Sequence, residues 1–301
     1  MATPTPLQLL ELRHAIIGED TPVARALPQR QRRTVGAWCF LDHAGPVQFA
    51  AGEGMHVGAH PHIGLQTFTW MIEGEVVHRD SLGNEQLIRT GEVNLMTAGR
   101  GIVHTEDSAH PGARLHAAQL WIALPDTQRH CAPAFVHHAE LPRTESGGFV
   151  LSVLVGSALG LHAPTAVHTP LLGLDLTATT AAATVLPLNS DFEHAVLLLQ
   201  GEALLDGQAL PASQWAYLPP GRSELALQCK ASAHLLLIGG QPFAETPLLW
   251  WNFVARNQAE IETALADWNA GRFAPVRPGS PAAPLSAPSL EGARLKPAFK
   301  T

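Results

Sequence analysis

The sequence predicts an all-β protein with two small barrels or sandwiches in tandem, followed by a short C-terminal helix and an extended tail. Two observations predict this class. Short apolar runs, rich in β-branched and aromatic residues and bounded by Gly, Asp, Asn and Pro, recur through residues 35–125. The same texture returns over residues 149–242, as two copies of one barrel would produce.

The first half is expected to contain most of its strands in four runs. The residues DSLGNE, at 80–85, predict a hairpin turn. The four runs span residues 35–45, 65–84, 86–99 and 113–125. The second half repeats the order of apolar strand, Gly, hairpin, polar strand and Gly-Arg turn. Its runs span residues 149–160, 171–188, 194–211, 214–228 and 231–242.

Polar and Gly residues in LPRTESGG, 141–148, mark the boundary between the halves. We therefore expect an N-terminal domain over 1–145, a second domain over 146–246 and a C-terminal region over 247–301. In the last region, Ile261, Leu265 and Trp268 recur at helical spacing, with Asn257 as N-cap and Gly271 as C-terminal stop. The residues after this helix are rich in Pro, Ala and Ser and predict an extended or mobile tail.

Composition narrows the possible compartments and partners. Of 301 residues, 46% are hydrophobic and 15% charged, and the formal net charge is -7. This balance gives no basic footprint for nucleic acid or an anionic membrane. Cys39, Cys131 and Cys229 lack metal-type spacing and favour a reducing compartment. Because neither a secretory leader nor a membrane-length apolar run is recognisable, we expect a cytoplasmic protein.

Two pairs of polar residues stand at strand period in the first half. His60 and His62 are two apart and should point to the same face, and His104 and Glu106 repeat this spacing. If their strands lie side by side and antiparallel, three imidazoles and one carboxylate converge. Such a mixed N/O set suits a divalent transition metal, Fe(II) best, although Ni, Mn, Co, Cu or Zn could occupy it. The sequence therefore predicts a metal site in the first domain.

The stretch HPHIGLQTFTWMIEGEVVHRDSLGNEQLIRTGEVNLMTAGRGIVHTE resembles the signature of the pirin family, a branch of the cupins, and the similarity covers about residues 10–270. It implies two jelly-roll barrels of the cupin type. The iron ligands of the family carry over onto His60, His62, His104 and Glu106. The Glu of the usual first cupin motif is replaced by Gln66 or Thr67, a rearrangement that pirins share.

The second domain lacks such a ligand set, so it is expected to be structural. His194 is interpreted as packed or hydrogen-bonded rather than as a ligand, and His78 and His116 as core or supporting groups. Phe68 and Trp70 are candidates to stack on an aromatic substrate or to fill the core. Gln119 and Met96 are candidates for the pocket wall.

The resemblance implies a quercetinase-type dioxygenase that cleaves a flavonol with dioxygen and releases carbon monoxide. In that interpretation Glu106 is the catalytic base that deprotonates the flavonol hydroxyl. The alternative is a non-enzymatic, redox-sensing iron regulator that acts through a protein partner, and a sugar isomerase or another cupin activity ranks below both. These functional hypotheses share the same metal ligands, so the ligand motif does not separate them. We favour the oxygenase.

Overall fold

The structure is a computed structural model that describes residues 6–18, 21–292 and 294–296, and all statements below concern these residues. The ends of the predicted first domain and of the predicted tail, 1–5 and 297–301, lie outside them, as do 19–20 and 293. The chain divides into two compact units. One comprises 14–23, 42–139 and 244–301, and the other 1–13, 24–41 and 140–243. Each unit contains one barrel.

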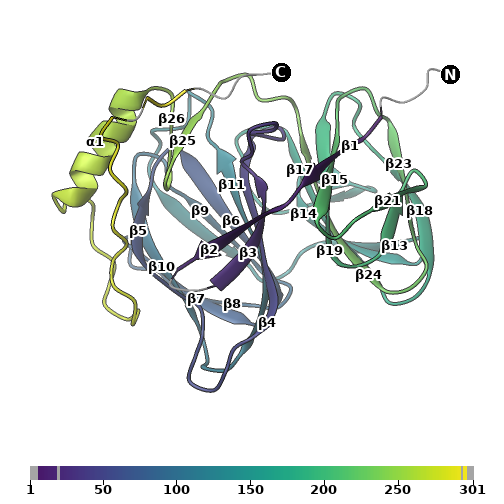
Figure 1. Cartoon of the computed structure of the whole chain (residues 1–301), viewed down its shortest axis with the longest axis horizontal. Coiled ribbons are helices and arrows are strands. Elements are labelled where there is room, and N and C mark those ends of the chain that lie inside the picture. Colours follow the sequence, from purple (N-terminus) through teal and green to yellow (C-terminus); the bar gives the residue numbers. More distant parts are fainter. Residues whose placement is uncertain (1–5, 19–20, 293, 297–301) are drawn as a thin grey trace. The chain divides into compact units, whose positions relative to one another are not determined.

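The first barrel consists of two sheets (Figure 1). The seven-stranded sheet has the order β12-β9-β6-β11-β4-β3-β2, and the four-stranded sheet the order β5-β10-β7-β8. The strands are β2 (Arg13–Ile17), β3 (Thr21–Leu27), β4 (Trp38–Gln48), β5 (His56–His62), β6 (Leu65–Glu73), β7 (Glu75–Asp80), β8 (Glu85–Arg89), β9 (Val93–Thr97), β10 (Ile102–Ser108), β11 (Arg114–Ala123) and β12 (Ala134–His138). The predicted hairpin turn at 80–85 joins β7 to β8 and is confirmed.

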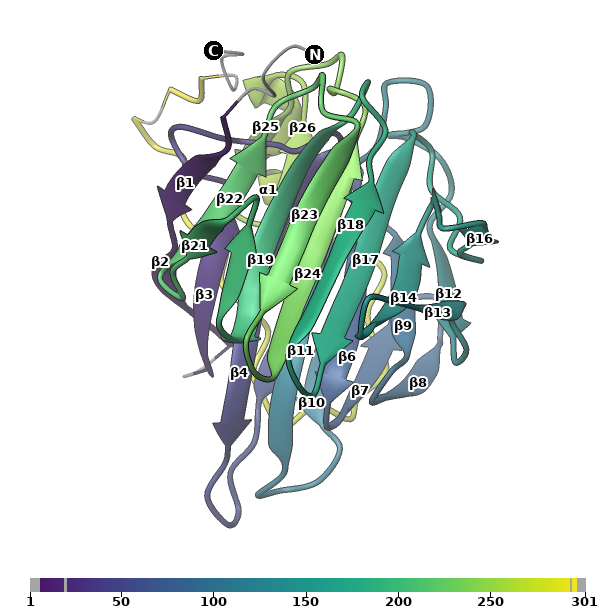
Figure 2. The ribbon, with the colours of Figure 1, turned by 90° about the vertical axis from the view of Figure 1, so that its right-hand side faces the viewer.

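The second barrel repeats this arrangement (Figure 2). Its sheets have the orders β1-β22-β19-β24-β17-β14-β13 and β18-β23-β20-β21, and β15 pairs with β16 in a separate hairpin. The strands are β1 (Gln8–Glu11), β13 (Arg143–Ser146), β14 (Phe149–Val155), β15 (Ser157–Ala158), β16 (Leu161–His162), β17 (Leu171–Ala178), β18 (Ala182–Pro187), β19 (Glu193–Gly201), β20 (Ala203–Leu205), β21 (Gln208–Leu210), β22 (Gln214–Leu218), β23 (Glu224–Cys229) and β24 (Ala233–Gly240).

The two sheet orders correspond strand by strand, which supports the internal duplication that the sequence indicated. β1 stands in the second barrel where β12 stands in the first. It pairs antiparallel with β22, with Gln8 opposite Tyr217. A strand from the beginning of the chain thus covers the edge of a sheet built from its second half, because an unpaired edge leaves backbone groups without partners.

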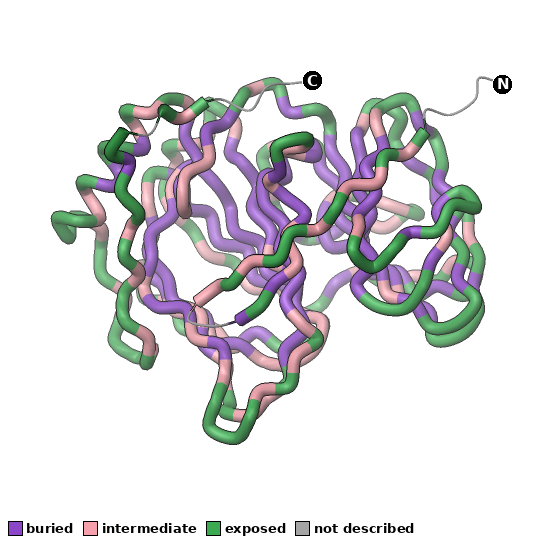
Figure 3. The backbone as a smooth tube through the Cα atoms, viewed as in Figure 1, coloured by how far each residue is buried: buried purple, intermediate pink, exposed green. Residues whose placement is uncertain are grey.

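The two interiors differ in chemistry, although both barrels have buried strands (Figure 3). The second is filled by a single apolar cluster, to which the strand pair β18–β23 contributes Leu186, Leu225 and Leu227. In the first barrel, one apolar cluster includes Met71, Ile88 and Leu115. The corresponding strand pair of this barrel, β5–β10, carries the buried residues His60, His62 and His104. Polar groups therefore occupy the space that aliphatic side chains fill in the second barrel.

The C-terminal region returns to the first barrel. A hairpin of β25 (Leu248–Trp250) and β26 (Phe253–Ala255) precedes α1 (Gln258–Asn269). The helix is capped as predicted, because Asn257 accepts from the backbone N–H of Glu260, and Gly271 follows with a φ of +67°. None of the described helices has the length and apolar character needed to span a membrane.

The tail is extended, as expected, and lies along the edge strand β5 (Figure 1). The backbone N–H of Leu285 donates to the carbonyl of Ala59 at 2.9 Å, and the indole of Trp268 donates to the carbonyl of Leu285 at 3.0 Å. Gly58 makes this approach possible, since a Cβ there would lie 1.8 Å from the carbonyl oxygen of Ala283. The tail therefore covers the strand that carries two of the candidate ligands.

Candidate metal centre

The histidine-bearing strands β5 and β10 are antiparallel neighbours, which is the arrangement that the convergence of the two pairs required. His104 lies opposite His60, and Ile102 lies opposite His62. A register shift follows His104, so that Glu106 pairs with Val57. Such an irregularity re-aims side chains locally. The strand pair thus brings three imidazoles together and displaces the carboxylate slightly from them.

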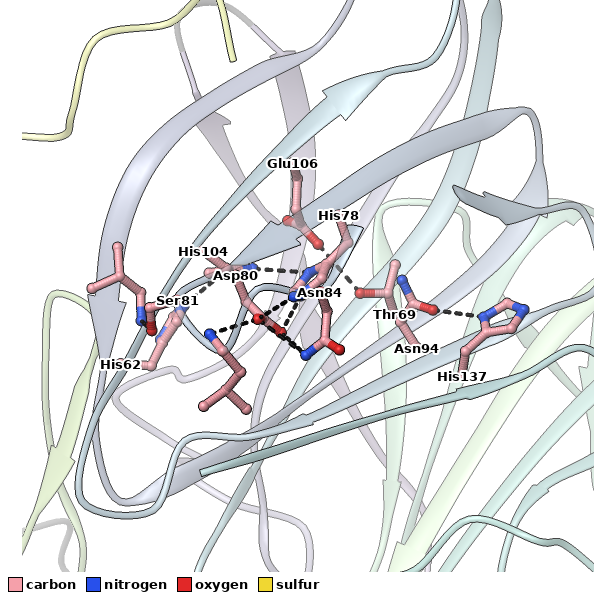
Figure 4. Close-up of polar contacts among 12 residues, drawn as sticks. His62, Thr69, His78, Asp80, Ser81, Asn84, Asn94, His104, Glu106 and His137 are labelled. Carbon is pink, nitrogen blue, oxygen red and sulfur yellow. Dashed lines mark hydrogen bonds and ion pairs between the residues drawn. The ribbon is translucent and has the colours of Figure 1, made fainter. Parts of the chain in front are cut away.

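The three imidazoles form a compact buried group, with exposed fractions of 6% for His60, 1% for His62 and 2% for His104. The ring centroids of His60 and His104 are 4.3 Å apart, and those of His62 and His104 are 5.0 Å apart. The Nε2 atoms of His62 and His104 approach to 3.1 Å (Figure 4). One ligand atom from each of the three rings lies within 4.8 Å of the others.

Backbone carbonyls determine which nitrogen carries the hydrogen in two of these rings. The Nδ1 of His60 lies 2.8 Å from the carbonyl of Gly58, and the Nδ1 of His62 lies 3.0 Å from the carbonyl of Asn252. A carbonyl only accepts, so both Nδ1 atoms donate and both Nε2 atoms keep a lone pair. The Nδ1 of His104 instead faces the Nδ1 of His78, at 3.3 Å.

Burial keeps the three rings neutral. It lowers the pKa of His60 to about 4, and the hydrogen bond to Gly58 opposes this only in part. Burial also lowers the pKa of His62 and of His104 well below the usual value, and the neighbouring imidazoles disfavour further positive charge. Neutral imidazole is the form that binds a metal ion, so the site is prepared for one at neutral pH.

Glu106 lies beside this group rather than within it. Its carboxylate, a nitrogen of His78 and a nitrogen of His104 lie within 4.8 Å of one another. Burial raises the pKa of Glu106. The hydroxyl of Thr69 lies 2.8 Å from Oε1 of Gln119 and 3.4 Å from Oε1 of Glu106. With a single hydrogen to donate, Thr69 serves the nearer Gln119.

The donor set fits a divalent transition metal. At a metal–nitrogen distance of about 2.1 Å, two nitrogens bound to one ion lie about 3 to 3.5 Å apart. The 3.1 Å between the Nε2 atoms of His62 and His104 agrees with that range. His60, His62, His104 and Glu106 could hold the ion, with further positions open.

The aromatic candidates on β6 do not face this site. Thr69 directs its hydroxyl toward Glu106 and Gln119, and side chains alternate along a strand. Phe68 and Trp70 therefore point to the opposite face, where both are buried. Of the two roles considered for them, filling the core agrees with this position. The chain bends at Gly64, with a φ of +70°, between β5 and β6, so the face of the histidine pair does not continue onto them.

The pocket-wall candidates do lie on the site face by register. Gln119 is opposite Thr69 and bonded to it, and Met96 is opposite Thr67. Trp121, also opposite Thr67, meets the ring of His62 edge-on with 5.1 Å between centroids. Sequence reasoning missed Trp121, although it is two residues from Gln119 and alternation would have found it.

A supporting network lies behind His104. His78, interpreted from the sequence as a core or supporting residue, contacts both His104 and Asp80 (Figure 4). Burial alone would raise the pKa of Asp80, but hydrogen bonds from His78 and Asn84 outweigh it and lower that pKa, so the carboxylate is ionised. Asp80 and Asn84 were missed, although the strand-period pair of His78 and Asp80 repeats the signal that identified the ligands.

The second barrel offers no comparable group among the described residues, since both clusters of three potential ligands lie in the first barrel. His194 is fully buried, and neither ring nitrogen has a hydrogen-bond partner in the described chain. Burial lowers its pKa to about 4, and the nearby Arg222 adds to this. It is packed within the barrel, and it is not hydrogen-bonded.

Comparison with known proteins agrees with this architecture. Residues 20–122 match the model of the pirin family, and residues 173–274 match that of the pirin C-terminal cupin domain. A Pseudomonas aeruginosa protein named "Putative quercetin 2,3-dioxygenase" is 51% identical over 265 residues, covering 88% of this chain and 84% of the relative. A "Pirin-like protein" of Caulobacter vibrioides is 38% identical over 259 residues, covering 83% of this chain and 89% of the relative.

Solved structures lead to the same family. The crystal structure of a quercetin 2,3-dioxygenase from Acinetobacter baumannii has a TM-score of 0.94 at 49% identity, over 97% of this chain and 98% of that one. A second structure with that title from the same organism has a TM-score of 0.82 at 27% identity, over 88% of this chain and 96% of that one. The resemblance and the tandem cupin fold are thus confirmed, and the chain belongs to the pirin family.

Proposed function

We propose that this protein is a metal-dependent dioxygenase of the quercetinase type, which cleaves a flavonol with dioxygen. The observation that carries the proposal is the convergence of three buried, neutral imidazoles beside one carboxylate. It is supported by the names of relatives at 49% and 51% identity, which describe quercetin 2,3-dioxygenases.

The proposed cofactor is one divalent metal ion held by His60, His62, His104 and Glu106, with Fe(II) as the native ion. Three nitrogens, one oxygen and open positions suit non-haem iron. Ni, Mn, Co, Cu or Zn could bind the same donors.

The ion would supply Lewis acidity toward the substrate oxygens and a path for electrons to dioxygen. In this proposal Glu106 takes the proton of the flavonol hydroxyl at a carboxylate oxygen. A carboxylate serves as a base only while it is not fully committed to a cation. Its position beside His78 and His104, rather than among all three imidazoles, supports that role. Burial raises its pKa, which favours proton uptake by this carboxylate.

Neighbouring residues would shape the substrate side of the site. Trp121, packed edge-on against His62, and the buried Met96 present apolar surface on the site face. Such surface suits a flat aromatic substrate and limits the access of water. Gln119 and Thr69 form a fixed polar pair next to Glu106.

The test is oxygen uptake by protein loaded anaerobically with Fe(II), measured after quercetin is added and together with the loss of flavonol absorbance. His62→Ala removes a candidate ligand. His110→Ala is the matched control, because His110 is an exposed histidine of the same barrel. We expect uptake in the wild type and in His110→Ala and none in His62→Ala. Absence of uptake by wild-type protein that holds iron would contradict flavonol cleavage and favour the redox-regulator alternative.

A further inference from the structure

We propose that His78 and Asp80 are positioning residues that hold the hydrogen of His104 on Nδ1, so that the Nε2 of His104 stays free to bind the metal ion. This inference rests on the proposed metal site. It concerns two residues that are not among the candidate ligands. A chain of hydrogen bonds connects the hairpin turn at 80–85 with His104.

Asp80 is the fixed end of the network. It is 1% exposed, and its carboxylate accepts hydrogen bonds from several groups of the turn (Figure 4). The backbone N–H of Leu82 donates to Oδ1 at 2.9 Å, and the side-chain amide of Asn84 donates to Oδ2 at 2.8 Å. The backbone N–H of Asn84 also donates to Oδ1, at 3.2 Å. The turn thus holds the carboxylate in one orientation.

The direction of each hydrogen bond follows from this end. An ionised carboxylate only accepts, so the Nε2 of His78, 3.2 Å from Oδ2 of Asp80, must carry the hydrogen. In the neutral form of His78, on which this inference rests, Nδ1 then has a lone pair. It lies 3.3 Å from the Nδ1 of His104, which must therefore be the donor. The Nε2 of His104 is left with a lone pair, directed toward the Nε2 of His62.

The ring of His78 cannot easily turn away from this arrangement. It is 2% exposed and stacks on Phe135, with centroids 4.4 Å apart and planes inclined by 13°. Its backbone is fixed by the pairing of His78 with Glu106 across β7 and β10. Packing and hydrogen bonding therefore act together on one orientation.

His104 differs from the other two imidazoles in what orients it. The Nδ1 atoms of His60 and His62 donate to main-chain carbonyls. A main-chain carbonyl remains a hydrogen-bond acceptor whichever side chain its residue carries. The partner of His104 is a side chain whose own hydrogen depends on Asp80. Groups of this kind fix the tautomer of a ligand, and their loss lowers metal affinity by about 10- to 100-fold. Substitution of Asp80 can therefore change which nitrogen of His104 carries the hydrogen.

Asp80→Asn tests the inference without touching a candidate ligand. The retained Oδ1 can still accept from the turn, whereas the new Nδ2 donates toward Nε2 of His78. His78 then carries its hydrogen on Nδ1 and forces that of His104 onto Nε2. Glu85→Gln is the matched control, because Glu85 is an exposed carboxylate of the same hairpin. Circular dichroism checks that all variants fold.

Two readouts separate this inference from the proposed function. Long-range ¹H–¹⁵N NMR of metal-free protein reports which nitrogen of His104 is protonated, and chelator competition reports the affinity for Co²⁺. We expect Nδ1–H in the wild type and in Glu85→Gln. For Asp80→Asn we expect Nε2–H and an affinity lower by about 10- to 100-fold. Nδ1–H and unchanged affinity in Asp80→Asn would overturn the inference. Failure of the wild type to bind Co²⁺ would count against the metal site, while the NMR result would still decide the tautomer.

A pair of substitutions at His78 gives a second test, in case Asp80→Asn does not fold. Both remove the imidazole and its stacking on Phe135. The side-chain carbonyl of His78→Gln can accept from Nδ1 of His104, whereas His78→Leu has no acceptor. We expect nearly wild-type Co²⁺ affinity for His78→Gln and a loss of about 10-fold or more for His78→Leu. Equal affinities in the two variants would contradict a positioning role.

Discussion

His194 should make the protein sensitive to acid through the second barrel. The ring is fully buried, and burial lowers its pKa to about 4. In the unfolded chain the pKa returns to about 6.5. The folded state therefore binds fewer protons, and its stability is fully present above pH 6.5 and falls as the pH drops from 6.5 to 4. The loss from this residue is about 2 kcal/mol at pH 5 and approaches about 3 kcal/mol near pH 4.

His194→Leu isolates this contribution. Leucine has a similar size and no titratable group, so the variant should lose about 2 kcal/mol less than the wild type between pH 7.5 and pH 5. At pH 7.5 it should be at least as stable, because two buried nitrogens without partners are removed. Urea denaturation of metal-free protein measures both, and titration of the remaining histidines cancels in the comparison. Parallel losses of stability in the two proteins would refute the reasoning.

Two further substitutions test the C-terminal region. Gly58→Ala would place a Cβ 1.8 Å from the carbonyl oxygen of Ala283 and should displace the tail, so limited proteolysis should cut the tail faster than in the wild type. An unchanged rate would show that the tail does not depend on this contact. Asn257→Ala removes the N-cap of α1 and should lower helix stability by about 1 kcal/mol, measured as faster amide exchange in the helix. Unchanged exchange would contradict the cap assignment.

Local patterns in the sequence were sufficient to identify the main features of the site. The strand period places His60 with His62, and only the pairing of the two strands had to be assumed. The strand period could not decide between the two roles considered for Phe68, because the chain bends between β5 and β6 and the sequence does not make this bend evident. The contact between His78 and His104 depends on the pairing of β7 with β10, which no local pattern specifies.

In the fold, too, local features were predictable and long-range pairings were not. Alternation, turn residues and the repeat predicted two barrels, and capping residues predicted α1 together with its N-cap Asn257. Long-range pairings were not predictable. The addition of β1 to β22 and the return of Leu285 to Ala59 join segments separated by about 200 residues. Such contacts arise from edge strands that need a partner, and a sequence does not state which segment supplies it.

We propose that His60, His62 and His104 form a metal centre in the first barrel and that the second barrel holds none. Elemental analysis of reconstituted protein tests it most directly, with His62→Ala and His104→Ala as disrupting variants and His194→Ala as the matched control from the second barrel. We predict one metal ion per chain in the wild type and in His194→Ala, and none in the other two. Stoichiometric metal retained in both His62→Ala and His104→Ala would contradict the account.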